Sequence, residues 1–196
     1  EVVVTDPPYG IKLDTTRTAK QPPRDKQGRL RTGRDHQPIF GDDEPFDPSH
    51  ILELDVPTVL WGANHFADKL PPSGGWLVWD KQRPDDLDQA TCELAWTNYV
   101  KGVRRLVHLW NGMMKASEHG VGLHPTSKPV ALMTWVLGLK WTPPGIVFDP
   151  YAGSGPVLLA ADRASRASCS IELAPAYCDV IVQRWETATG GKAVRG

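Results

Sequence analysis

The sequence lacks the features that mark several large classes of protein. No apolar run approaches the roughly 20 residues that a membrane-spanning helix requires. The first residues, Glu1 to Asp6, do not resemble a signal peptide. The formal net charge is only -1, so global charge does not indicate a nucleic-acid partner, and any such interpretation depends on local charge.

Cysteine is also scarce. Cys92, Cys169 and Cys178 are an odd number of cysteines, and neither they nor the histidines have the spacing of metal ligands. We therefore expect no bound metal and no disulfide framework. Reduced thiols are typical of a cytoplasmic protein, and that is the location we predict.

Hydrophobic residues, in contrast, are plentiful enough to build a core. They make up 40% of the 196 residues, and eight tryptophans are among them. A chain of this length fits one domain, so we predict a single domain over residues 1–196.

The first half of the chain reads mainly as short strands. Val2–Val4 is an apolar run that ends before Asp6-Pro7, which is typical of a buried strand. Four further stretches are short, contain tryptophan and are bounded by proline, glycine or charged residues. These predicted strands are residues 56–61, 76–79, 92–100 and 103–110. A helix is predicted between the first two of them, over Gly62–Leu70.

The second half alternates between strands and helices. Leu132, Val136 and Leu139 recur at helical spacing within a predicted helix over Lys128–Lys140. The predicted elements that follow are a strand at 146–149, a helix at 153–163, a strand at 167–173 and a helix at 176–187. This alternation predicts an α/β fold with a doubly wound, mostly parallel sheet.

A basic segment follows the first strand. Residues 12–38 contain Pro22-Pro23 and almost no large apolar side chain, so their composition predicts a mobile loop that cannot build a core. Its basic residues are Lys12, Arg17, Lys20, Arg24, Lys26, Arg29, Arg31 and Arg34. Taken alone, the segment is read equally well as a solvated linker.

A glycine-containing loop, Asp149–Gly155, lies between a predicted strand and a predicted helix. Glycines there allow a backbone to approach a ligand closely. Glu172 ends the next strand, where a Rossmann-type site places an acid that accepts hydrogen bonds from ribose hydroxyls. We interpret the two together as a cofactor site. A turn that binds no nucleotide is the alternative, and a dehydrogenase is disfavoured because the loop lacks the full spaced-glycine pattern.

The sharpest feature is Asp6-Pro7-Pro8-Tyr9, at the end of the first strand. Residues that precede proline are driven to extended conformations, and proline fixes φ and lacks an N–H. The segment can therefore present a carboxylate, an unpaired carbonyl and an aromatic ring together. This set suits a planar base amino group, because Asp6 and the Pro7 carbonyl can each accept one of its hydrogens and Tyr9 can stack on the base. A proline turn that merely ends a strand is the alternative.

In this order, the motifs resemble those of the beta group of DNA amino-methyltransferases, whose motif order is circularly permuted. Asp6–Tyr9 resembles the catalytic motif, and His124–Pro129 resembles the segment before the cofactor strand. Asp149–Gly155 resembles the methionine-binding loop, and Glu172 the ribose-binding acid.

The resemblance implies a Rossmann-like methyltransferase fold with a seven-stranded sheet and S-adenosylmethionine as the cofactor. Trp61–Asn64 and His108–Met113 are similar in particular to phage and prophage modification methylases, a class tied to restriction–modification. The resemblance therefore implies the cytoplasm of a bacterial or phage-infected bacterial cell. By resemblance, Asp6, Pro7, Pro8 and Tyr9 hold the target base. The implied cofactor-binding residues are Thr126, Lys128, Asp149, Tyr151, Gly153, Gly155 and Glu172.

The implied substrate is double-stranded DNA, whose target nucleotide must leave the duplex to reach Asp6. Because the basic segment directly follows the catalytic motif, it becomes a candidate for contacts with phosphates. An aspartate at the first catalytic position resembles adenine-N6 enzymes more than cytosine-N4 enzymes. Adenine N6 is therefore the predicted target.

Three other functions stay open. The first is methylation of cytosine N4. The second is a truncated, inactive DNA-binding remnant, because the family has a further strand before its catalytic strand and this sequence begins without one. The third is methylation of RNA or of a protein glutamine, but families with those activities usually place the cofactor loop before the proline-rich motif.

Overall fold

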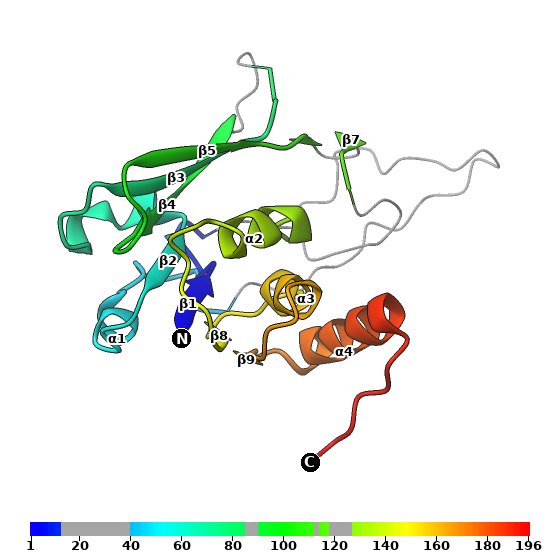
Figure 1. Cartoon of the computed structure of the whole chain (residues 1–196). Coiled ribbons are helices and arrows are strands. Elements are labelled where there is room, and N and C mark those ends of the chain that lie inside the picture. Colours follow the sequence, from blue (N-terminus) through cyan, green and yellow to red (C-terminus); the bar gives the residue numbers. More distant parts are fainter. Residues whose placement is uncertain (13–39, 85–89, 112–113, 118–126) are drawn as a thin grey trace, which may run out of the picture.

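A seven-stranded sheet in the order β5-β3-β4-β2-β1-β8-β9 forms the centre of the protein (Figure 1). Its strands are β1 (Val2–Thr5), β2 (Thr58–Trp61), β3 (Gly75–Asp80), β4 (Cys92–Thr97), β5 (Val103–Val107), β8 (Val147–Asp149) and β9 (Ser168–Ser170). The computed structural model describes residues 1–12, 40–84, 90–111, 114–117 and 127–196. A separate two-stranded sheet pairs β6 (Trp110–Asn111) with β7 (Met114–Lys115).

Six strands of the large sheet run in one direction, and β4 runs against them. Parallel pairs join β1 to β2 and to β8, β8 to β9, and β3 to β5. The two pairs made by β4, with β2 and with β3, are antiparallel. The predicted α/β class with a mostly parallel sheet is confirmed, and so is the number of strands that the resemblance implies. The carboxyl ends of β1, β2 and β8 consequently lie together at one edge.

Helices cover both faces of this sheet. α2 (Val130–Leu137), α3 (Pro156–Arg163) and α4 (Pro175–Thr189) lie on one face, and the short α1 (Ser49–Leu52) lies on the other (Figure 1). Within the described residues, no helix has both the length and the apolar character needed to cross a membrane.

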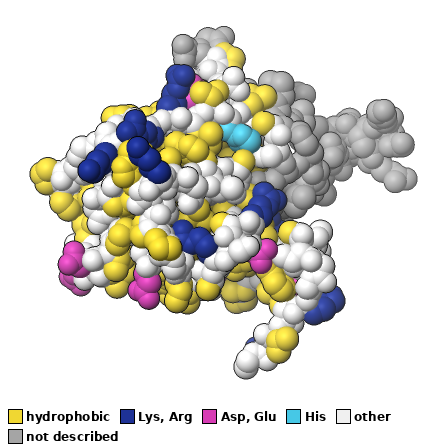
Figure 2. Space-filling view, in the orientation of Figure 1, with side chains coloured by type: hydrophobic (Ala, Val, Ile, Leu, Met, Phe, Trp, Pro, Cys, Tyr) yellow, Lys and Arg dark blue, Asp and Glu magenta, His cyan; other side chains and the backbone are white. Residues whose placement is uncertain are grey.

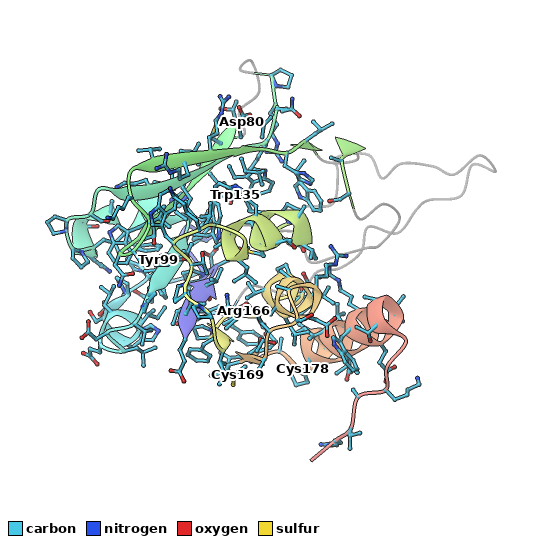
Figure 3. All side chains as sticks on the ribbon, viewed as in Figure 1. Asp80, Tyr99, Trp135, Arg166, Cys169 and Cys178 are labelled. Carbon is cyan, nitrogen blue, oxygen red and sulfur yellow. The ribbon has the colours of Figure 1, made fainter. Side chains whose placement is uncertain are left out.

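Alternate side chains of β1 enter two different cores, as the period of a strand requires. Val2 and Val4 pack with the buried face of α2 and α3, whereas Val3 packs with Ile51 of α1. Tyr99 and Trp135 lie at the margin of the first core (Figure 3). All three valines of β1 are buried, so the position of the segment that follows this strand is well defined by packing.

Two predicted helices differ from the structure. Gly62–Leu70 forms two 3₁₀ turns, η1 (Ala63–His65) and η2 (Ala67–Lys69), because Phe66 has a φ of -139° and buries its ring in the second core. The helix predicted from Lys128 begins only at Val130, because Pro129 has extended backbone angles. It ends before Gly138 instead of continuing to Lys140.

α4 packs less tightly than the other long helices. None of its side chains is fully buried. Its apolar side chains Tyr177, Val180, Ile181 and Trp185 are half-buried. The helix is therefore attached mainly through the edge of the core and through a polar contact described below.

A group of exposed basic side chains lies at the start of β5, where Figure 2 shows Lys and Arg gathered on the surface. Arg104 and Lys140 both approach the ring of Trp141, each at 4.6 Å from its centroid. β5 runs in the same direction as β1, so the start of β5 and the carboxyl end of β1 lie at opposite ends of the strands. This basic group therefore lies on the side of the sheet away from the carboxyl end of β1.

Candidate functional site

A cavity of about 600 Å³ opens at the carboxyl ends of the parallel strands. Its wall contains Asp6–Tyr9, which follow β1, and Asp149–Ser154, which follow β8, together with Glu172 beyond β9. A volume of this size is typical of small-molecule sites, and the edge is the one at which open α/β sheets bind ligands. The segments predicted separately to hold a target base and a cofactor thus line one cavity.

A buried hydrogen bond joins the two segments. The hydroxyl of Thr5, the last residue of β1, donates to Asp149 Oδ1 at 2.6 Å. The backbone N–H of Tyr151 donates to the same oxygen at 3.1 Å. Burial raises the pKa of Asp149 to about 7, although both of these hydrogen bonds oppose the rise. This carboxyl group therefore titrates near neutral pH in the folded protein.

The glycine loop depends on Glu172 for its shape. Glu172 Oε2 accepts a hydrogen bond from the N–H of Gly153, and Oε1 accepts one from the N–H of Ala174, both at 2.8 Å. Gly153 has a φ of 53° and Gly155 a φ of 76°, a region that favours glycine. A Cβ at Gly155 would also lie 3.1 Å from the side chain of Ile181 in α4. Glu172 thus braces the loop while it also faces the cavity.

Tyr151 connects the glycine loop to α1. Its ring packs edge-on to Phe46, with centroids 5.7 Å apart. Its hydroxyl is 3.0 Å from Nε2 of His50. The loop is consequently fastened on one side to β1, through Asp149, and on the other to the helix that covers the opposite face of the sheet.

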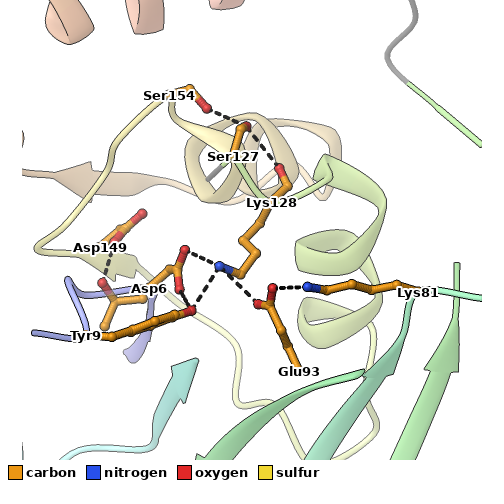
Figure 4. Close-up of polar contacts among 9 residues, drawn as sticks. Asp6, Tyr9, Lys81, Glu93, Ser127, Lys128, Asp149 and Ser154 are labelled. Carbon is orange, nitrogen blue, oxygen red and sulfur yellow. Dashed lines mark hydrogen bonds and ion pairs between the residues drawn. The ribbon is translucent and has the colours of Figure 1, made fainter. Parts of the chain in front are cut away.

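The carboxylate of Asp6 receives donors on both of its oxygens (Figure 4). Tyr9 donates its hydroxyl hydrogen to Oδ1 at 2.5 Å. Lys128, just before α2, donates from Nζ to Oδ2 at 2.5 Å and to the Tyr9 hydroxyl at 3.0 Å. A carboxylate has about four lone-pair positions, so Asp6 can still accept a hydrogen from a ligand.

The ring of Tyr9 is held by two neighbouring residues that also line the cavity. His65 stacks on it, with centroids 4.8 Å apart and planes 14° from parallel. Gly62 lies so close that a Cβ at this position would overlap the Tyr9 ring, and its φ of 70° is in the left-handed region. The site therefore requires glycine directly after β2, because any side chain there would overlap the Tyr9 ring.

Two charged residues that the sequence pattern does not single out complete the polar wall. Glu93, in β4, forms ion pairs with Lys81 and with Lys128; its Oε2 is 3.1 Å from Lys128 Nζ (Figure 4). Glu93 and Lys81 line the same cavity as Asp6. The sequence shows Glu93 as a single glutamate in an otherwise apolar, tryptophan-containing strand. That pattern marks the residue as unusual, but it does not identify the lysines with which Glu93 pairs.

Burial and ion pairing act in opposite directions on these groups. Burial raises the pKa of Asp6, while the charge of Lys128 opposes that rise. Burial lowers the pKa of Lys128, but the charges of Asp6 and Glu93 outweigh it and hold the pKa well above its ordinary value. Burial likewise raises the pKa of Glu93, but the two lysine charges outweigh it, and the net shift is downward. The geometry is that of a charged, paired cluster.

A second polar chain runs from the glycine loop to α4. Ser154 Oγ lies 2.7 Å from Ser127 Oγ in buried surroundings. Arg184, from α4, donates to the backbone oxygen of Ser154 and, at 3.0 Å, to its Oγ. Because Ser127 directly precedes Lys128, the C-terminal helix is linked through the loop to the residue beside Asp6.

The predicted site residues are placed as follows. Asp6, Pro7, Pro8, Tyr9, Lys128, Asp149, Tyr151, Gly153 and Glu172 line the cavity. Gly155 starts α3 behind the loop. Thr126 and the basic residues Arg17, Lys20, Arg24, Lys26, Arg29, Arg31 and Arg34 lie outside the described residues.

The two ends of the basic segment meet beside the catalytic motif. Asp42 Oδ1 accepts hydrogen bonds from the N–H groups of Gly10 and Ile11, at 2.9 and 3.2 Å. The N–H of Lys12 donates to the Asp42 carbonyl at 2.9 Å. Ile11, Phe40 and Asp42 line the cavity, so the chain leaves and re-enters the described structure at its mouth.

Comparison with known proteins identifies a family for these features. Residues 77–183 match the DNA methylase family of N6/N4 methyltransferases. The matched range includes Glu93, Lys128, the glycine loop and Glu172, and Asp6–Tyr9 precede it.

Solved structures share the fold. The M1.HpyAVI complex with SAM is 20% identical with a TM-score of 0.51, over 94% of this chain and 88% of that chain. TTHA0409 of Thermus thermophilus, named a DNA modification methylase, is 16% identical with a TM-score of 0.51, over 97% and 87%. The cytosine-N4-specific PvuII DNA methyltransferase is 14% identical with a TM-score of 0.55, over 94% and 78%. At these identities the likeness concerns the fold alone.

Proposed function

Because the chain belongs to the DNA methylase family of N6/N4 methyltransferases, we propose that it transfers a methyl group from S-adenosylmethionine to an exocyclic amino nitrogen of DNA, with adenine N6 as the target. The observation that carries this proposal is the single cavity lined by both Asp6–Tyr9 and the Asp149–Ser154 loop. An acceptor nitrogen and a methyl donor bound there would be neighbours, as a direct transfer requires.

The cofactor end of the cavity suits S-adenosylmethionine. Two carboxylates, Asp149 and Glu172, face it, and a Cβ placed at Gly153 would have no atom within 4 Å, so space is open beside the loop. Asp149, Tyr151 and Gly153 would hold the methionine end, and Glu172 would accept hydrogen bonds from the ribose. When bound, the cofactor supplies an electrophilic methyl group.

The catalytic motif can prepare the accepting nitrogen. Asp6 has lone pairs left after it accepts from Tyr9 and Lys128. The carboxylate and the Pro7 carbonyl would each accept one amino hydrogen, which directs the nitrogen lone pair towards the methyl group. Tyr9, braced by His65, would stack on the base. An aspartate at the first position favours adenine by resemblance.

Duplex DNA would have to present this base outside the helix. The anchoring of Gly10, Ile11 and Asp42 brings both ends of the basic segment to the cavity mouth. The arginines and lysines of that segment are therefore proposed to contact phosphates on either side of the target nucleotide.

Product analysis tests the proposal. The full chain would be incubated with deuterium-labelled S-adenosylmethionine and duplex DNA, and the digested nucleosides analysed by mass spectrometry. We expect labelled N6-methyldeoxyadenosine from the wild-type protein. Asp6→Ala should keep less than about 1% of that turnover, because it loses the carboxylate that accepts one of the two amino hydrogens.

Other products would redirect or end the proposal. Labelled N4-methyldeoxycytidine would show that the target base is cytosine and would leave the proposed methyl transfer unchanged. Label found only in an RNA or protein substrate would overturn DNA as the substrate. Cofactor binding without any labelled product would indicate a DNA-binding remnant.

A further inference from the structure

Two buried lysines and two half-buried carboxylates alternate across the wall of the cavity. Asp6 contacts Lys128, Lys128 contacts Glu93, and Glu93 contacts Lys81 (Figure 4). They come from four separate elements: the ends of β1 and β3, the segment before α2, and β4. Two positive and two negative groups lie together, so the cluster as a whole is neutral.

Lys128 has two opposite effects on methyl transfer, if the proposed function holds. Its ammonium group lies 2.5 Å from Asp6 Oδ2 and favours the ionised carboxylate. The accepting nitrogen, however, gains positive charge as it bonds to the methyl group, and a nearby ammonium group repels that charge. In a buried site such repulsion is only weakly screened.

Glu93 is positioned to offset the second effect, and Lys128 keeps its contact with Asp6, although the charge of Glu93 also contributes to raising the pKa of Asp6. Its Oε2 lies 3.1 Å from Lys128 Nζ, on the cavity wall. Lys128 acts on this carboxylate through its charge as well as through the close contact, and both lower the pKa of Glu93. Lys81 pairs with the other oxygen, Oε1, and fixes the carboxylate in this orientation.

A carboxylate used only for packing would be an expensive choice here. Replacing buried ion pairs by apolar groups of similar shape is often neutral or stabilising. Glu93 instead stands between two lysines in a strand whose other cavity neighbours include Trp79 and Trp110. Its charge compensates two buried lysines, and one of them, Lys128, contacts Asp6.

We propose that Glu93 is a positioning residue for methyl transfer: it holds Lys128 between two carboxylates, so that Lys128 stays paired with Asp6 while its positive charge is offset at the accepting nitrogen. Glu93 acts through Lys128 and does not itself touch the base or the cofactor.

The Glu93→Gln variant of the full chain tests this role by steady-state kinetics. The amide keeps the shape and can still accept a hydrogen, but it removes the charge. We expect kcat to fall about tenfold, the effect of one uncompensated interaction of this size, with KM for DNA and for cofactor changed less than about twofold.

The pH profile gives a signature that packing alone would not produce. Because the charge of Glu93 contributes to raising the pKa of Asp6, its removal should move the acidic limb of kcat to lower pH while the plateau falls. Carbon-13 NMR titration of aspartate-labelled protein should show the same downward shift of Asp6, assigned with Asp6→Asn, and this measurement needs no turnover.

Two variants serve as controls. Glu93→Asp keeps the charge and should restore much of the plateau, while Glu53→Gln removes an exposed glutamate at the end of α1 and should leave kinetics and titration unchanged. A normal kcat in Glu93→Gln, or a reduced kcat with an unmoved Asp6 titration, would overturn the proposal. If the wild-type protein methylates no base, the proposed methyltransferase function is wrong. The role of Glu93 is tested separately, because an unchanged Asp6 titration in Glu93→Gln would contradict it without any measurement of turnover.

Discussion

Thr5 donates a hydrogen bond of 2.6 Å to Asp149, and it thereby connects the strand before the catalytic motif to the strand before the glycine loop. The bond lies in buried surroundings, where it stabilises the ionised carboxylate against the effect of burial. Burial still prevails and holds the pKa of Asp149 near 7. The charge of Asp149 therefore depends on a residue from the other half of the site.

Thr5→Val should weaken cofactor affinity at pH 7 and have little effect at pH 9. Valine has nearly the same shape but no donor, so the pKa of Asp149 rises further and fewer carboxylates are ionised at neutral pH. A lost hydrogen bond to a charged group corresponds to roughly 1.5–3 kcal/mol, or at least about tenfold in affinity. Calorimetric titration with S-adenosylhomocysteine at both pH values measures it.

The matched control is Thr58→Val, which removes a hydroxyl whose hydrogen bond, among the described residues, goes to the Val56 carbonyl. Its cofactor affinity should not acquire a pH dependence. An equal loss of affinity at pH 7 and pH 9 in Thr5→Val would contradict the electrostatic explanation and point to altered packing.

Asp149→Asn should remove a pH-dependent cost in stability. The ordinary pKa of the group is 3.8, and in the folded protein it is about 7. Below about pH 4 both states are neutral and no cost arises; as the pH rises to 7 the unfolded chain ionises first, so stability falls, and the loss is complete above pH 7. A shift of about three units corresponds to at most about 4 kcal/mol.

Asparagine can still accept the hydrogen bonds from Thr5 and Tyr151, and it cannot ionise. The stability of the variant relative to wild type should therefore increase between pH 4 and pH 8. Urea denaturation of the cofactor-free protein at several pH values would show this. A stability difference that stays constant across the range would show that Asp149 is not the titrating group.

Glu172→Ala should reduce cofactor affinity by roughly 1.5–3 kcal/mol, since it removes a charged acceptor. It also leaves the N–H groups of Gly153 and Ala174 without their partner, so the loop should lose order before any ligand is added. Glu172→Gln keeps one acceptor oxygen, so its cofactor affinity should lie between those of the wild-type protein and the alanine variant. Calorimetry measures the affinities, and an unchanged value in the alanine variant would exclude a role in cofactor binding.

Neutralising Arg24, Arg29, Arg31 and Arg34 together should weaken DNA binding and leave cofactor binding intact. For every phosphate interaction that the substitutions remove, the slope of log affinity against log salt should fall by about 0.9 on duplex DNA. Fluorescence anisotropy at three salt concentrations measures the slope. A loss uniform across sequences indicates phosphate contacts, whereas a loss on one sequence indicates base contacts.

The basic group at the opposite edge of the sheet supplies a control of equal charge. Its members are Lys101, Arg104, Arg105 and Lys140, all exposed. Neutralising these four should change the slope far less, because none of them lines the cavity. Equal slopes in both variants would assign the effect to net charge, and an unaltered slope in the arginine variant would return the segment to the role of a linker.

The features found correctly from the sequence are those that local chemistry determines. Asp6-Pro7-Pro8-Tyr9 is stiff because of its prolines. It also follows a buried apolar run, so its position at the end of a strand could be predicted. The glycine loop was readable because a strand, a turn and a helix follow one another within a few residues. The alternation of strands and helices then predicted parallel neighbours, and β1 and β8 are such neighbours.

The features that were missed depend on contacts between distant parts of the chain. The sequence around Glu93 does not indicate that Lys128, from a distant segment, lies opposite it in the fold. The reversed direction of β4 follows from its pairing with β2 and β3, which composition does not encode. The helix predicted over Gly62–Leu70 is broken because Phe66 turns into a core built largely by other elements. Tertiary packing overrides local preference in each case.

The weak burial of α4 has a consequence for local unfolding. A helix with no fully buried side chain should open at low free energy, and its amides should exchange with solvent sooner than those of β1 or β2. Arg184 joins that helix to Ser154 in the glycine loop, so opening of α4 removes a donor from the loop. By linkage, a ligand that orders the loop slows hydrogen exchange in α4, and the C-terminal helix thus reports occupancy of a cavity that it borders only through Tyr177.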